Sequence, residues 1–175
     1  ASILNGILTL TIYFLFNHLG LGAKKSFFYS ACFSILAYPS SGTLFVDHHS
    51  TFLSILALNI FIWSMINNKD YLWFLIPILM TFAFLSKQVP STYILFIIII
   101  VLFFHLIFQP KKKIFKILSI ISVSSFLVVI LLLIFLNINS IELQNFFIQY
   151  IKYPSSLGSE RFNNLNYDFK NLFLD

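Results

Sequence analysis

Long apolar runs separated by short polar stretches make up most of this chain. An α-helix needs roughly 20 apolar residues to cross a hydrocarbon core about 30 Å thick. Six runs reach or approach this length, at residues 2–19, 26–39, 44–66, 71–85, 90–108 and 114–136. The second and fourth runs are the short ones. The pattern predicts an all-α, polytopic membrane domain over residues 1–136, with about six transmembrane helices.

The pattern changes after Leu136, where polar residues mix with aromatic ones. Asn139 and Glu142 stand three residues apart, as the two members of a capping box do. Apolar and aromatic residues follow at roughly helical spacing, at Phe146, Phe147, Tyr150 and Ile151. We expect a short interfacial helix there, then a turn-rich loop at 153–158. Residues 137–175 are therefore predicted to form an extracytoplasmic segment.

Composition supports a membrane protein. Hydrophobic residues make up 59% of the chain and charged residues 10%, with a mean hydropathy of +0.91, which leaves too little polar surface for a soluble globule of 175 residues. The net charge is +5, but the basic cluster at 111–113 and Lys116 lies between apolar runs. This indicates a juxtamembrane position and argues against nucleic-acid binding. The single cysteine, Cys32, excludes an internal disulfide and a cysteine-rich metal site.

The lysines predict an orientation, because cytoplasmic loops carry an excess of positive charge. With six alternating spans, one side receives Lys24, Lys25, Lys69, the lysines at 111–113 and Lys116. That side has seven basic residues and one acid, Asp70, whereas the other side has four basic and five acidic residues. The first side is predicted to be cytoplasmic. The DHH tripeptide at 47–49, the SKQVP stretch at 86–90 and the C-terminal segment then share the extracytoplasmic side.

The DHH tripeptide is the most polar stretch beside an apolar run. Ionisable groups cost about 2.5 to 3.5 kcal/mol each at the centre of a membrane helix, so they generally have a function or a partner. Asp47 could cap the helix that follows, but His48 and His49 are not needed for a cap. In an extended segment Asp47 and His49 would share a face. They could then hold a divalent cation with a carboxylate from elsewhere, or a protonated histidine could bind phosphate.

Three further residues are candidates for anion binding. Lys87 precedes Pro90, whose missing N–H suits the first turn of a helix. It is either an interfacial lysine that reaches water or a cation for a lipid phosphate, to which Gln88 could add a hydrogen bond. Arg161 is the sole arginine; it could grip phosphate or pair with Glu160. The substrate-binding candidates are thus Asp47, His48, His49, Lys87, Gln88 and Arg161, and the metal candidates are Asp47 and His49.

Two stretches, YPSSGTLFVDHHSTFLSILAL at 38–58 and FAFLSKQVPSTYIL at 82–95, resemble the GT-C membrane glycosyltransferases. That class includes protein O-mannosyltransferases and aminoarabinose transferases. Leu85, Ser86 and Lys87 match a leucine, a serine or threonine and a lysine at the corresponding helix end, and the DHH resembles an acidic motif of archaeal oligosaccharyltransferase catalytic subunits. The resemblance implies that Asp47 and His49 bind a divalent metal and that Lys87 contacts the donor phosphate.

The class implies transfer of a sugar from a polyprenyl-phosphate donor to an acceptor on the outer face of a bacterial inner membrane, in assembly of the cell envelope. Its usual catalytic aspartate lies in the first outer loop. No acidic residue precedes Asp47, so the catalytic residue is unknown and we expect a fragment that begins after that loop. A transporter or flippase-like carrier is the alternative, because Asn5, Asn17 and Asn59 fall within predicted spans. A non-catalytic membrane subunit is a third possibility.

Overall fold

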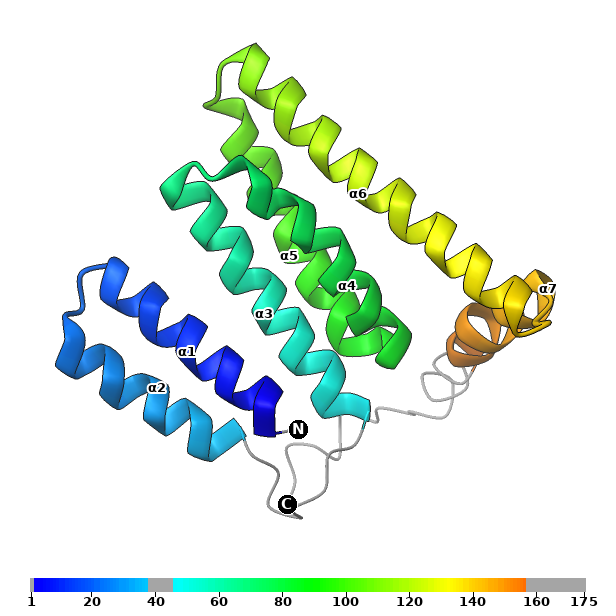
Figure 1. Ribbon diagram of the computed structural model, residues 1–175, viewed down its shortest axis with the longest axis horizontal. Coiled ribbons are helices and arrows are strands. Elements are labelled where there is room, and N and C mark those ends of the chain that lie inside the picture. Colours follow the sequence, from blue (N-terminus) through cyan, green and yellow to red (C-terminus); the bar gives the residue numbers. More distant parts are fainter. Residues whose placement is uncertain (1, 38–45, 157–175) are drawn as a thin grey trace, which may run out of the picture. The chain divides into compact units, whose positions relative to one another are not determined.

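The computed structural model describes residues 2–37 and 46–156, and in these ranges every regular element is a helix (Figure 1). This confirms the all-α prediction. The elements are α1 (Ser2–His18), α2 (Ala23–Ala37), α3 (Val46–Asn67), the 3₁₀ helix η1 (Asp70–Phe74), α4 (Leu75–Ser86), α5 (Gln88–Ile107), α6 (Lys111–Ile138), α7 (Leu143–Phe147) and the π-helical turn η2 (Ile148–Lys152). Each predicted apolar run contains a helix. The predicted ends at 39 and 44 lie outside the described residues.

Three helices are long and apolar enough to cross a membrane among the residues described. They comprise Asp47–Asn67 in α3, all of α5 and all of α6. Together, η1 and α4 form a shorter apolar helix, Asp70–Ser86. With 17 and 15 residues, α1 and α2 are also shorter than a perpendicular crossing requires. In its described residues the protein is therefore an all-helical membrane protein with three candidate spans, and the predicted six are not confirmed.

Contacts between residues divide the chain into two compact units, Ala1–Val129 and Ile130–Asp175, with the boundary inside α6. In the first unit successive helices run in opposite directions (Figure 1). The central helix is α3, which packs against α1, α4 and α5. The first unit is thus a helical bundle built around the helix that carries the DHH tripeptide.

Two clusters of buried apolar side chains hold α3 in this bundle. One cluster joins α3 to α1 and includes Leu8 and Phe52. The other joins α3 to η1, α4, α5 and α6, and includes Phe61, Trp73 and Ile117. Trp73 is almost completely buried, and its ring meets that of Phe61 edge to face at a centroid distance of 5.6 Å. This contact joins the start of the short η1–α4 segment to α3.

Small polar residues occupy many of the buried positions of the first unit. Seven of its described serines are buried, namely Ser26, Ser30, Ser50, Ser54, Ser64, Ser91 and Ser124. Large apolar side chains such as Phe96, Phe103 and Phe126 are instead exposed on α5 and α6. This reverses the pattern of a soluble protein. Lipid tails are as apolar as leucine, so helices in a bilayer associate through small residues and leave large apolar ones on the outside.

The lysines gather at one end of the first unit. Lys116 Nζ lies 2.6 Å from Asp70 Oδ2, so the start of α6 lies against η1. The rings of His18 and Trp63 are 5.0 Å apart, which brings the α1–α2 turn to the same end. This lysine-rich end carries Lys24, Lys25, Lys69, Lys111, Lys112, Lys113 and Lys116. The grouping predicted from alternating helices is therefore present in the structure.

The structure of the second unit differs from two local predictions. Asn139 does not begin a helix: α6 extends to Ile138, and Asn139 Nδ2 donates a hydrogen bond to the Phe135 carbonyl at 2.8 Å. Glu142 itself stands at the N-cap of α7, so the capping-box prediction is wrong. The predicted loop at 153–158 is also wrong over its described part, because residues 153–156 are helical. A helical segment does follow Glu142, as expected.

Candidate functional site

The helix α3 begins one residue before the DHH tripeptide. Asp47 therefore lies in the first turn of α3 rather than before it, and its backbone carbonyl accepts a hydrogen bond from Thr51 Oγ1 at 2.8 Å. A carboxylate is favourable there because the N-terminal end of a helix carries partial positive charge. The extended conformation expected for 47–49 is wrong. Each residue of a helix is rotated by about 100° about the helix axis from the one before it, so residues two apart point to nearly opposite sides. Asp47 and His49 therefore do not share a face.

A single non-helical residue joins α4 to α5. Lys87 has φ −159° and ψ 135°, an extended conformation between the last residue of α4 and the first of α5. The cause is Pro90, which lies in the first turn of α5, as predicted. In a continuous helix the Pro90 ring would clash with the carbonyl of Ser86 and would leave that carbonyl without its N–H donor. The helix therefore breaks at Lys87.

Hydrogen bonds on both sides fix the backbone of Lys87. Its N–H donates to the Ala83 carbonyl at 3.0 Å, within α4. Its carbonyl accepts from Ser91 Oγ in α5 at 2.9 Å and from Ser50 Oγ in α3 at 2.8 Å. Ser50 is fully buried, so this bond is shielded from water. The helix break is thereby tied to the first turns of α3.

The same contact brings the side chains of Asp47 and Lys87 together. Lys87 Nζ lies 2.6 Å from Asp47 Oδ1, and the side chains are 40% and 49% exposed, respectively. Two residues selected from the sequence for separate reasons thus form one ion pair, although they are 40 positions apart. Exposed pairs of this kind contribute only about 0 to 1 kcal/mol to stability. The fold therefore does not depend on this ion pair.

The other candidate residues lie around this pair or outside the described chain. Gln88 follows Lys87 directly as the first residue of α5. His48 and Asp47 both line a cavity of about 380 Å³ between α2 and α3, whose walls are otherwise mostly apolar. His49 is half-buried on α3. Arg161 lies outside the described residues, so its predicted role stays a prediction.

No metal centre is visible in the residues that the structure describes. Within 2–37 and 46–156, no three His, Cys, Asp or Glu side chains gather closely enough to hold a metal ion. Because Asp47 and His49 lie on different faces of α3, they lack the shared orientation that motivated the expected metal site. Metal binding by Asp47 and His49 stays a prediction, and it requires ligands from outside these ranges.

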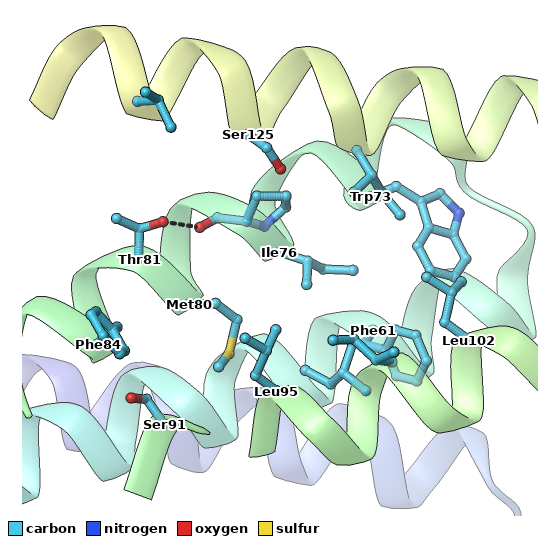
Figure 2. A pocket seen from close by; sticks show the side chains of 15 residues that line it. Phe61, Trp73, Ile76, Met80, Thr81, Phe84, Ser91, Leu95, Leu102 and Ser125 are labelled. Carbon is cyan, nitrogen blue, oxygen red and sulfur yellow. Dashed lines mark hydrogen bonds between the residues drawn. The ribbon is translucent and has the colours of Figure 1, made fainter. Parts of the chain in front are cut away.

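A larger apolar cavity lies between the helices of the first unit. Its volume is about 430 Å³, and its walls come from α3, η1, α4, α5 and α6 (Figure 2). Its polar lining is small and consists of Thr81, Ser91 and Ser125. Thr81 donates a hydrogen bond to the Pro77 carbonyl, and Ser91 donates one to the Lys87 carbonyl. Ser91 therefore connects the wall of this cavity to the backbone of Lys87. The residue that carries the cation is thus linked through its backbone to an apolar space of the same unit.

Sequence reasoning missed the role of two serines. Neither Ser50 nor Ser91 is among the candidate residues that the sequence indicates. Their signal is weak, because serine in an apolar run is common in helices that pack closely. The contact of Ser50 with the Lys87 carbonyl depends on how α3 packs against the α4–α5 break.

The asparagines inside the apolar runs link helices. Asn5 Nδ2 in α1 donates to the Ser34 carbonyl in α2 at 3.1 Å, and Asn59 Nδ2 in α3 donates to Thr11 Oγ1 in α1 at 3.2 Å. Asn17 is exposed near the end of α1. Hydrogen bonds of this kind hold membrane helices together. Packing therefore accounts for Asn5 and Asn59 without a polar path through the membrane.

These features define a class: a helical membrane protein with an ion pair at one end of its bundle and an apolar cavity between its helices. The chain matches no protein-family model, no curated protein and no solved structure. The resemblance to GT-C glycosyltransferases therefore rests on the two sequence stretches that suggested it.

We expect Ser50→Ala to lower the free energy of unfolding by about 1 kcal/mol, because the Lys87 carbonyl loses one of its two side-chain donors. Ser54→Ala is the matched control. Ser54 is as buried as Ser50 and lies one turn further along α3, but its hydroxyl has no hydrogen-bond partner among the described residues. Unfolding in sodium dodecyl sulfate followed by circular dichroism measures both variants. Equal losses would show that the bond to Lys87 contributes nothing specific.

Proposed function

We propose that this chain is part of a GT-C-type membrane glycosyltransferase. It would take a sugar from a polyprenyl-phosphate donor and pass it to an acceptor on the extracytoplasmic face of a bacterial inner membrane. The observation that supports this most is the position of Lys87: its ammonium group pairs with Asp47 at one end of the bundle, and its carbonyl accepts a hydrogen bond from Ser91, which lines an apolar cavity. A lipid-linked phosphate needs both features, a cation for its head and an apolar surface for its tail.

In this proposal Lys87 exchanges its bond to Asp47 for the donor phosphate. When the bond between the sugar and the phosphate breaks, negative charge develops on the departing phosphate, and a fixed ammonium group stabilises that charge. Gln88 adds a hydrogen bond to the phosphate or the sugar, and Arg161 gives a further phosphate contact. The acceptor's proton goes to a carboxylate base, and the residue that provides this base is unknown.

The proposal also assigns roles to the acidic motif. Asp47 keeps Lys87 in place when no donor is bound. Together with His48, it also lines the cavity of about 380 Å³ between α2 and α3. Asp47 and His49 are the proposed metal ligands, completed by groups outside the described residues. The lysine-rich end would face the cytoplasm, with all six helices, α1, α2 and α4 included, crossing the bilayer. Residues 137–175 would then be extracytoplasmic.

The test is Lys87→Gln in the complete protein, reconstituted in lipid nanodiscs. Hydrogen bonds to charged groups contribute about 1.5 to 3 kcal/mol, so we expect affinity for a polyprenyl phosphate to fall about tenfold to hundredfold. Transfer of a radiolabelled sugar should fall with it. Lys24→Gln removes the same charge at the lysine-rich end and should keep wild-type affinity. Unchanged binding and turnover in Lys87→Gln would remove Lys87 from the site.

A further inference from the structure

The lysine-rich end brings two separate turns of the chain into contact. Lys113 Nζ in α6 donates a hydrogen bond to Asn68 Oδ1, and Lys116 pairs with Asp70. Asn68 and Asp70 are the two neighbours of Lys69. Because both neighbours contact the first turns of α6, Lys69 is held close to the stretch that contains Lys111 and Lys112.

The backbone contributes to this arrangement. Asn68 has φ +52°, in the left-handed region that asparagine tolerates better than most residues. This conformation ends α3 and turns the chain toward η1. The turn that presents Lys69 is therefore fixed by its own backbone and by two contacts from α6.

Positive charge at this end exceeds the negative charge available to balance it. Asp70 is the one acid there among the described residues, and it already pairs with Lys116. Lys69, Lys111 and Lys112 are exposed and have no ion pair or side-chain hydrogen bond within the described parts of the chain. Ammonium groups held near one another repel, and an anion between them removes that repulsion.

Large apolar side chains flank the lysines. Phe108 is 84% exposed and precedes them at the end of α5, whereas Phe115 is 76% exposed and follows them in α6. A soluble anion would gain nothing from these two rings. A phospholipid would place its phosphate at the lysines and its acyl chains against the phenyl groups, in the way that basic clusters next to membrane helices bind anionic lipids.

We propose that Lys69, Lys111 and Lys112 form a binding site for the headgroup of an anionic phospholipid. The contacts of Asn68 with Lys113 and of Asp70 with Lys116 build this site, because they bring the α3–η1 turn against the start of α6. The proposal is independent of the glycosyltransferase activity, since it concerns the opposite end of the bundle and requires no sugar donor.

Energy transfer from tryptophan can test this site in the unmodified protein. The chain has two tryptophans, Trp63 near the end of α3 and Trp73 in η1, and both belong to the segments next to the lysines. The full chain is reconstituted in phosphatidylcholine nanodiscs that contain a phosphatidylglycerol with a dansyl group on one acyl chain. Phosphatidylcholine with the same label is the neutral comparison. We expect energy transfer to saturate at a lower fraction of the labelled anionic lipid than of the neutral one.

The decisive variants are matched pairs. Each lysine near a membrane surface contributes roughly fivefold to anionic lipid affinity, so Lys111→Gln with Lys112→Gln should weaken the preference about 25-fold. Lys24→Gln with Lys25→Gln removes the same charge from the same end, away from Lys69, and should keep the preference. Lys111→Arg with Lys112→Arg should also keep it. Equal losses in both glutamine pairs, no loss in the first pair, or displacement of the labelled lipid by equimolar inorganic phosphate would overturn the proposal.

Discussion

Replacing Trp73 by alanine should lower the free energy of unfolding by about 3 to 5 kcal/mol. The side chain is only 1% exposed, meets Phe61 edge to face and stacks against the ring of His105 at 6.0 Å. Truncation removes all these contacts and extends the 430 Å³ cavity that Trp73 already lines.

Phe103→Ala is the control for this prediction. Phe103 is 63% exposed on α5, where lipid or detergent can fill the vacated volume, so its loss should cost no more than about 0.5 kcal/mol. Titration with sodium dodecyl sulfate, followed by circular dichroism, gives both values without relying on tryptophan fluorescence. A Trp73 variant as stable as the Phe103 variant would mean that η1 does not pack against α3 as described.

Ser54→Leu should lower the free energy of unfolding by about 3 kcal/mol, the upper end of the range for overpacked interiors. Ser54 lies on α3 with no exposed surface, and α3 has neighbours on several sides. The larger side chain would have to push a neighbouring helix outward. The membrane gives no compensation, because leucine gains nothing by moving from lipid into a helix interface.

Comparison with Ser54→Ala separates size from polarity at the same position. Alanine fits the available space, and it removes a buried hydroxyl that has no hydrogen-bond partner in the described chain, so this variant should be as stable as the wild type or slightly more stable. Thermal inactivation of the reconstituted protein gives a second measure. A leucine variant with wild-type stability would contradict the close packing around α3.

The helices could be predicted because long apolar runs leave little choice of structure in a membrane. The predicted number of membrane spans is not confirmed. Although α1 and α2 appear where expected, their lengths of 17 and 15 residues do not by themselves establish a crossing. Pro90 correctly indicated the start of α5, because the clash of its ring with a preceding carbonyl is a local effect.

The candidate site was only partly predictable. Asp47 and Lys87 stood out because charges are rare in this chain, but their pairing depends on how α3 meets the α4–α5 break. The extended form of 47–49 was wrong because α3 begins at Val46, which no local signal in the sequence marked. Ser50 could not be recognised, since its partner is a backbone carbonyl 37 positions away.

The one-residue joint between α4 and α5 has a mechanical consequence. A peptide chain has two soft torsions per residue, so φ and ψ of Lys87 set the angle between these two helices. Both helices are walls of the apolar cavity. The three hydrogen bonds that hold the backbone of Lys87 therefore also hold these two walls at a fixed angle to each other.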